Sequence, residues 1–453
     1  MNREIRKVVR KRSVKRRLNH DQEEERQPLS GKGEFLDELL IEILSSLPVK
    51  SLCRFKCVCK AWWKLLSDTQ FVKLHINKSI TANRVTYTLY DEYKFPIRLE
   101  LDHEAVVNGQ KAKPTADVSL FGPEIRNGDH WKSLLRHNNT GEMEVWGCCN
   151  GVLCILASPN IMVLANPSTR ETKTITRRRR RFPIDSVGGG FGYDAVNDDY
   201  KIVKINPYIR TVRVYSLRKD SWSCLRKFRN MNLIPPITCL KQGVHLNGAI
   251  HWLGYQSKDG QELVYITAFD LTKQEFFHIP TPIAATVNGI DYDHYLNVVG
   301  GCLCVTVRDQ YYMGRPISDF WVMEKYGVEE SWKNSRLSFS YHSLRALDLN
   351  FPNTNEALYL VGVSEQLFLY NLRDGSRKEV NIGPIPGDYA SFSNGLKLNT
   401  SFAYVESLVS LGQICGSNSR KRQMPRYVDR IPSRPKSKRP KNRPVRCKDY
   451  QLV

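Results

Sequence analysis

Large apolar side chains recur at helical spacing between residues 35 and 75. The first set occupies positions i, i+3, i+4, i+7, i+8 and i+11, namely Leu36, Leu39, Leu40, Ile43, Leu44 and Leu47. This spacing predicts an amphipathic helix, which Pro48 ends because proline lacks a backbone N–H. Ser51 is expected to cap a second helix that carries the apolar run from Leu52 to Leu66. A third helix is expected to begin near Asp68.

This helical unit has apolar residues on more than one side. Phe35 and Ile41 fall off the stripe of the first helix, and the adjacent Trp62 and Trp63 cannot point in the same direction. A segment of roughly 40 residues buries too little surface to be stable alone. The unit is therefore expected to cover its remaining apolar surface with another polypeptide.

The residues from Leu36 to Trp62 also carry a family pattern, L-x-x-L-L-x-E-I-L-x-x-L-P-V-K-S-L-x-R-F-K-C-V-C-K-x-W. This run resembles the F-box of plant substrate adaptors, although the family usually opens with Leu-Pro where this chain has Phe35-Leu36. On periodicity alone these side chains would be core residues, and the resemblance favours docking. It implies that one set of residues shares the packing of three helices and the docking on a Skp1-type adaptor: Leu36, Leu39, Leu40, Ile43, Leu44, Leu47, Pro48, Val49, Leu52, Val58, Cys59 and Trp62.

From Val145 onwards, short apolar runs are separated by turn residues, and helical periodicity is nearly absent. The runs form pairs, and the hairpin of each pair recurs about every 50 residues, a period typical of kelch-type propeller blades. Candidate hairpin positions are Asn166, Leu217, Leu271, Lys325 and Leu372. Two further candidate strands lie at 84–93 and 116–125. The predicted fold is a multidomain α+β chain in which a small all-α, three-helix unit precedes an all-β, propeller-like domain.

The β-rich region resembles the F-box-associated interaction domain of plant proteins. The matching segments are GCCNGVL at 147–153, NPST at 166–169, GFGYD at 190–194, DDYKIV at 198–203, GAIHW at 248–252 and YVESLVSL at 404–411. The resemblance covers most of residues 145–412 and implies a propeller-like domain that recruits a protein substrate.

The formal net charge of +22 is concentrated at the two ends of the chain. Residues 1–17 contain nine Lys or Arg and one acidic residue, and residues 420–448 contain thirteen and one, so the rest carries a net charge of +2. Both ends are expected to be disordered. They could act as nuclear-localisation signals or phosphate-binding arms, or be solvated tails without a partner.

These patterns predict four segments: a basic tail at 1–30, the F-box at 31–78, the β-domain at 84–412 and a basic, proline-rich tail at 413–453. The N-terminus lacks the apolar region of a secretory signal, and no apolar stretch is long enough for a membrane span. A soluble protein of the nucleus, the cytoplasm or both is expected. The twelve cysteines fit a reducing compartment. They lack the paired spacing of a zinc site, so neither a metal nor a cofactor is expected.

Candidate catalytic features all have simpler interpretations. The run GGGFG at 188–192 lacks a phosphate-binding register and is interpreted as a tight turn. His245 and His251 flank an expected Asn-Gly hairpin and are interpreted as strand residues. Asp198 and Asp199 are expected to be solvated in a turn. The five arginines at 177–181 either recruit an acidic ligand or form a repelling surface loop.

No nucleophile or metal-dependent motif is apparent, so no enzymatic activity is expected. The leading hypothesis is a substrate-recognition subunit of a Skp1–cullin–F-box ubiquitin ligase, with the F-box on the adaptor and the β-domain on a protein substrate. The alternatives are a nuclear nucleic-acid or chromatin binder that uses the basic tails, and a kelch-propeller enzyme or lectin. The near-neutral body disfavours nucleic-acid binding beyond weak contacts through the tails.

Overall fold

A computed structural model of the chain describes residues 32–81, 84–91, 96–102, 113–116, 144–158, 161–176, 188–206, 211–225, 242–258, 261–281, 283, 286–287, 290–309, 317–338, 344–346, 356–361, 366–371, 376–380 and 398–415. These residues belong to the first of two compact units, Met1–Gly416 and Ser417–Val453. Several predictions lie outside them: the tail at 1–30, most of the tail after residue 412, the arginine run, Leu372 and nearly all of the candidate strand at 116–125.

The helical unit contains four helices: α2 (Lys32–Ser45), α3 (Val49–Phe55), α4 (Lys60–Leu66) and α5 (Thr69–Thr81). Helix α2 contains the predicted stripe except Leu47, which lies in the bend after the helix, and Pro48 separates α2 from α3 as expected. Asp68 caps α5, because its Oδ1 accepts the N–H groups of Gln70 at 2.9 Å and Phe71 at 3.2 Å. The predicted start near Asp68 is therefore confirmed.

The second predicted helix differs from the structure in two respects. Ser51 lies inside α3 and caps nothing, because α3 already begins at Val49 and the Pro48 carbonyl accepts the N–H groups of Ser51 and Leu52. The apolar run is also broken between Phe55 and Lys60. The Cys59 sulfur accepts the N–H of Trp62 at 3.4 Å and so caps the separate helix α4.

The core of the helical unit contains residues from all four helices and one residue from the far end of the chain. Its buried members are Leu44, Val49, Leu52, Leu66, Phe71 and Leu408. Phe55 and Trp62 pack against this core, and their rings contact each other edge to face with centroids 5.3 Å apart. The four helices therefore do not complete their own core.

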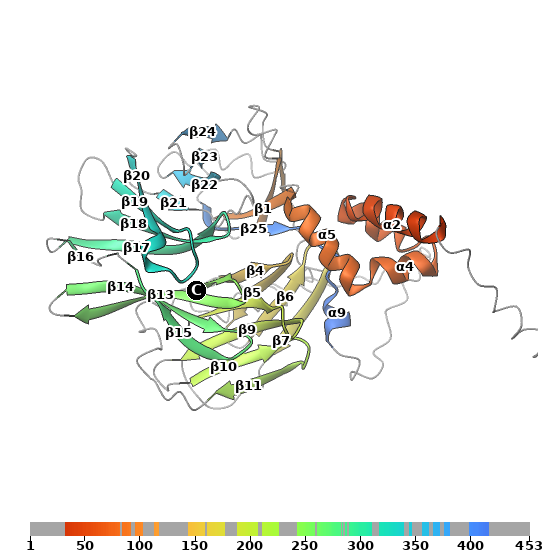
Figure 1. Cartoon of the computed structure of the whole chain (residues 1–453), viewed down its shortest axis with the longest axis horizontal. Coiled ribbons are helices and arrows are strands. Elements are labelled where there is room, and N and C mark those ends of the chain that lie inside the picture. Colours follow the sequence, from red (N-terminus) through yellow and green to blue (C-terminus); the bar gives the residue numbers. More distant parts are fainter. Residues whose placement is uncertain are drawn as a thin grey trace, which may run out of the picture. The chain divides into compact units, whose positions relative to one another are not determined.

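The remaining described strands form five hydrogen-bonded sheets (Figure 1). The first joins β25 (Leu398–Val405), β1 (Arg84–Asp91), β2 (Pro96–Asp102) and β3 (Lys113–Ala116). The second contains β4 (Glu144–Cys149), β5 (Val152–Ser158), β6 (Ile161–Asn166) and β7 (Glu171–Thr176). The third contains β8 (Gly189–Asp194), β9 (Asp199–Asn206), β10 (Thr211–Ser216), β11 (Ser221–Leu225), β12 (Gln242–Leu246), β13 (Ala249–Lys258), β14 (Gln261–Asp270) and β15 (Glu275–Ile279). The fourth contains β16 (Thr286–Val287), β17 (Ile290–Val299), β18 (Cys302–Asp309), β19 (Ile317–Met323) and β20 (Trp332–Ser338), with a 3-10 turn η4 (Glu329–Ser331). The fifth contains β21 (Leu344–Ala346), β22 (Glu356–Val361), β23 (Gln366–Asn371) and β24 (Arg377–Val380).

Each sheet contains one or two antiparallel groups of about four strands, which we call meanders. This arrangement confirms the predicted all-β, propeller-like domain. The last strand, β25, pairs antiparallel with the first, β1, so the two ends of the domain meet in one sheet. The eight-stranded sheet joins two such meanders through parallel pairing of β8 with β12, where Gly189 and Gly190 lie opposite Gln242 and Gly243.

The glycine run at 188–192 lies in and beside β8 and is a buried strand, so its interpretation as a tight turn is wrong. The glycines are required by close neighbours. A Cβ at Gly189 would lie 2.3 Å from the Trp146 ring, and one at Gly190 would lie 2.5 Å from the side chain of Ile250. Glycine here lets β8 approach its neighbours, a role that local sequence cannot reveal.

The predicted hairpin positions recur at one place in the repeating unit. Asn166, Leu217, Leu271 and Lys325 each lie at the turn before the last strand of a meander, which confirms the repeat at these four positions. Three of these turns end on a residue with left-handed φ, namely Arg170 (60°), Asp220 (47°) and Gln274 (58°). The predicted Asn247-Gly248 hairpin is also confirmed, with φ of 49° and 73°.

The C-terminal end of the β-domain leads into a short helix, α9 (Leu411–Ile414). The predicted boundary between the β-domain and the C-terminal tail, after residue 412, falls inside this helix. Glu171 fixes the start of this helix to the β-domain, because its Oε2 accepts the N–H of Leu411 at 2.7 Å and the hydroxyl of Ser410 at 3.0 Å.

Candidate docking surface on the helical unit

Exposed apolar side chains are concentrated on the helical unit. Of the eight large hydrophobic residues exposed in the described chain, five lie between residues 39 and 74. Four of them form what we call the exposed apolar set: Leu39 (42% exposed), Ile43 (61%), Val58 (65%) and Trp63 (55%). Leu39 and Ile43 are four residues apart on α2 and so lie on one face. Exposed hydrophobic residues that share a face mark a candidate interaction surface.

The structure separates the predicted adaptor-binding residues into three groups. Leu44, Val49 and Leu52 are buried and hold the helices together. Half-buried residues packed against that core are Leu40, Leu47 and Trp62. The exposed residues are Leu39, Ile43, Pro48, Val58 and Cys59. The side chain of Leu36 lies outside the described residues. Some members of the set thus form the helical core, and others are exposed.

Trp63 is exposed and was not among the predicted docking residues. The available signal was its position next to Trp62, since neighbouring residues on a helix point in different directions. Trp62 packs against the core with Phe55, so Trp63 is directed away from it.

The helices of this unit also carry exposed charged residues. Lys50 and Arg54 on α3 and Lys60 and Lys64 on α4 are all exposed. The acidic residue Glu42 on α2 is occupied by an ion pair with Lys78 of α5, with 2.5 Å between Nζ and Oε1.

One side of helix α5 packs against the chain's own β-domain. Ile76 belongs to a buried cluster with Trp146, and Lys73 forms an ion pair with Asp198 in the β8–β9 turn, with 3.0 Å between Nζ and Oδ1. His75 is buried and lies 2.9 Å from the Leu47 carbonyl oxygen through its Nε2, which ties α5 to the end of α2. These contacts leave the exposed apolar set uncovered.

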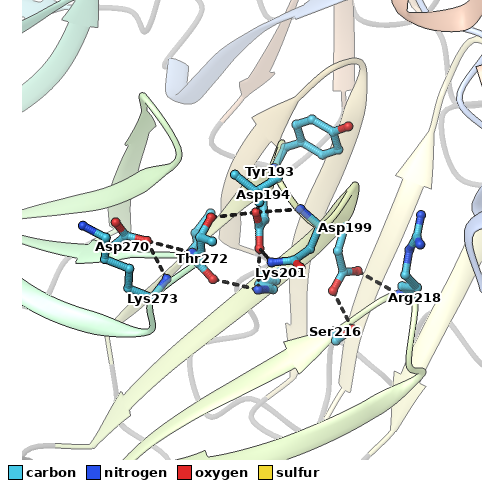
Figure 2. A network of polar contacts seen from close by, with 12 residues as sticks. Tyr193, Asp194, Asp199, Lys201, Ser216, Arg218, Asp270, Thr272 and Lys273 are labelled. Carbon is cyan, nitrogen blue, oxygen red and sulfur yellow. Dashed lines mark hydrogen bonds and ion pairs between the residues drawn. The ribbon is translucent and has the colours of Figure 1, made fainter. Parts of the chain in front are cut away.

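The β-domain holds a buried polar network around Asp194 (Figure 2). Lys201 donates to Asp194 Oδ2 and to the Leu271 carbonyl, both at 2.7 Å, and Thr272 donates to Asp194 Oδ1 at 2.8 Å. Burial raises the pKa of Asp194, but the hydrogen bonds from Lys201, Asn197 and Thr272 outweigh this effect and hold the pKa well below its ordinary value. The network joins β8 and β9 to the β14–β15 turn and has a structural role.

The expectation that Asp199 is solvated is wrong. Its side chain is buried and accepts the Ser216 hydroxyl at 2.5 Å and the Arg218 N–H at 2.8 Å (Figure 2). Asp198, the preceding residue, has a left-handed φ of 52° and points to Lys73 and Arg218. Because neighbouring residues alternate sides at a strand start, two adjacent acids have different environments.

His245 and His251 lie in the paired strands β12 and β13, as expected. Burial lowers the pKa of each imidazole to about 4. The Nδ1 of His245 lies 3.5 Å from the sulfur of Cys149, but burial raises the pKa of that thiol to about 12, so the pair does not form a reactive thiolate. In the described part of the chain, no three His, Cys, Asp or Glu residues are grouped as a metal site. None of its helices combines the length and apolar character needed to cross a membrane.

Comparison with known proteins agrees with both halves of this architecture. Residues 118–411 match the model of the F-box associated beta propeller domain, and residues 37–75 match an F-box-like model. The chain belongs to the F-box-associated β-propeller family. It is a plant-type F-box protein with a C-terminal associated domain, and such proteins serve as substrate adaptors.

Several proteins of Arabidopsis thaliana are similar to this chain. The F-box/kelch-repeat protein At3g23880 is 26% identical over 307 residues, which cover 65% of this chain and 77% of that protein. The F-box protein CPR1 is 24% identical over 395 residues, which cover 78% and 86% of the two chains. The putative F-box protein At3g16210 is 28% identical over 251 residues, covering 54% and 60%. These relatives indicate no catalytic family.

Proposed function

We propose that this F-box protein is the substrate-recognition subunit of a Skp1–cullin–F-box ubiquitin ligase. A Skp1-type adaptor covers the exposed apolar set, and the adaptor connects the chain to a cullin. The β-domain binds a protein substrate. The chain contributes no catalytic residue, because its role is to hold the substrate near a ubiquitin-loaded enzyme and so to raise the effective concentration of one for the other.

The exposed apolar set carries this proposal. Leu39, Ile43, Val58 and Trp63 lie inside the F-box match at 37–75, yet the helical core does not use them. Burying one large apolar side chain on association contributes about 1.5–3 kcal/mol before the costs of binding. Ile43 is the most informative member, because it is widely exposed while its neighbour Leu44 is buried.

The topology of the β-domain supports a separate site for the substrate. Lys73 of α5 contacts the turn that follows β8, at one end of the strands. Since β8 and β9 are antiparallel, the first residue of β8 and the last residue of β9 lie at the opposite end of these strands. We propose that the substrate binds at that opposite end of the strands, so that the adaptor and the substrate do not compete for one surface.

A pull-down with a purified Skp1-type adaptor tests the proposal. Ile43→Asp in the full chain should reduce adaptor capture at least ~30-fold, because the docked carboxylate would be desolvated without a partner. Val196→Asp is the matched control, since Val196 is 78% exposed in the β8–β9 turn. It should leave capture unchanged. Equal capture of wild type and Ile43→Asp, or no capture by wild type, would contradict the proposed docking.

A further inference from the structure

Residues Ser407–Leu411 belong to the core of the helical unit and to the core of the β-domain at once. They directly follow β25, the strand that closes the first sheet on β1. Leu408 is only 1% exposed and packs among Leu44, Val49 and Leu52 of the helical unit. The helices thus bury their core around a side chain from the other end of the chain.

The residues next to Leu408 face the β-domain. Val409 and Leu411 lie in a buried cluster that contains Trp146. Asn166, at the end of β6, donates through Nδ2 to the carbonyl oxygens of Ser407 at 3.1 Å and Val409 at 2.8 Å. The segment therefore alternates, with Leu408 towards the helices and its neighbours towards the sheet.

Further contacts seat this segment on the second sheet. Glu171 Oε2 accepts the Leu411 N–H at 2.7 Å, as described above. Gly151, whose φ is 76°, leaves the space that the segment occupies: a Cβ there would lie 2.4 Å from the Val405 carbonyl oxygen and 2.5 Å from the Ser407 hydroxyl. Buried polar contacts of this kind allow one position of the segment and disfavour others.

We infer that the chain couples adaptor docking to closure of its β-domain through residues Ser407–Leu411. Leu408 reaches the helical core only when β25 has paired with β1 and the segment is seated on Asn166 and Glu171. Without Leu408, a unit this small lacks a complete core, and α2 no longer holds Leu39 and Ile43 in place. A chain with an open β-domain would then dock poorly. The functional part of this inference rests on the proposed function, whereas the coupling of the two cores does not.

Hydrogen exchange of the full chain tests the coupling without an adaptor. The reporters are the amides of Leu52 in α3 and of Lys56 directly after α3, which donate to the carbonyls of Pro48 and Leu52. Leu408→Ala should speed their exchange at least ~30-fold, as expected for truncating a buried leucine. Asn166→Ala, which changes no residue of the helical unit, should speed it at least ~5-fold because it frees two buried carbonyls. Leu74→Ala, at a partly exposed leucine of α5, is the control and should change it less than ~2-fold.

Each outcome bears on the coupling. Unchanged exchange of α3 in both Leu408→Ala and Asn166→Ala would overturn it. Faster exchange in Leu408→Ala alone would also overturn the coupling, because loss of the Asn166 contacts in the β-domain would then have no effect on the helical unit. If Asn166→Ala does not fold, Glu171→Gln takes its place with the same expected direction. Adaptor capture is measured in parallel: faster exchange in a protein whose wild type captures no adaptor would support the coupling and refute the proposed function.

Discussion

Removing Lys201 should destabilise the β-domain more than any surface substitution. The substitution Lys201→Met keeps the length of the side chain and removes its charge. Asp194 is fully buried and would keep its hydrogen bonds from Asn197 and Thr272, but it would lose the one cation that pairs with it among the described residues. Breaking a buried ion pair costs about 3–5 kcal/mol. Because Asp194 retains other donors, we expect a loss of about 3 kcal/mol in the free energy of unfolding.

Urea unfolding of the full chain at pH 7, followed by tryptophan fluorescence, measures this loss. The low pKa of Asp194 means that its contribution is fully present above about pH 4 and declines as the pH falls towards the folded-state pKa. Lys219→Met, at an exposed lysine of the β10–β11 turn, is the control and should cost less than about 0.5 kcal/mol. Adding Asp194→Asn to Lys201→Met should recover at least about 1 kcal/mol, since no buried charge remains. A loss below about 1 kcal/mol for Lys201→Met, or no recovery in the double variant, would refute the reasoning.

Two further predictions concern the β-domain. Burial lowers the pKa of His245 from 6.5 to about 4, so the unfolded chain binds more protons than the folded chain below pH 6.5. The free energy of unfolding should therefore fall by about 2 kcal/mol between pH 7 and pH 5 because of this residue. In urea unfolding at both pH values, His245→Gln should show a smaller fall, and an equal fall would count against a neutral, buried imidazole. Gly190→Ala places a methyl group 2.5 Å from Ile250 and should cost about 2–3 kcal/mol in the same assay. Gly301→Ala, in open space but at a left-handed φ of 76°, should cost only about 1 kcal/mol. Equal losses at the two glycines would argue against crowding at β8.

Local patterns predicted the elements whose causes are local. The leucine spacing of α2, the break at Pro48 and the helix start near Asp68 depend on residues within a turn of one another. The turns after Asn166 and Leu217 were recognised from their place in a repeat. In each of these cases the residues that determine the structure are neighbours in the sequence.

The errors concern residues whose environment comes from distant parts of the chain. Gly190 reads as a turn residue, yet a contact with Ile250 requires the glycine inside a strand. Asp199 reads as a solvated acid, yet Ser216 covers it. Leu408 carries no local sign that it completes the core of helices more than three hundred residues earlier.

The sequence predicted where the candidate site lies, but not which of its residues are buried and which are exposed. Helical spacing placed Ile43 and Leu44 together among the apolar residues, although one is exposed and the other is buried against Leu408. A stripe at 3.6-residue spacing shows which residues share a face, and only the tertiary packing shows how much of that face the chain itself covers.

Hydrogen exchange of the wild-type chain with and without a purified Skp1-type adaptor tests the central claim most directly. The adaptor should protect the peptides that contain Leu39–Ile43 and Val58–Trp63, and it should leave the exchange of β12 to β15 unchanged. Protection confined to the β-domain, or no protection at saturating adaptor, would contradict docking through the exposed apolar set.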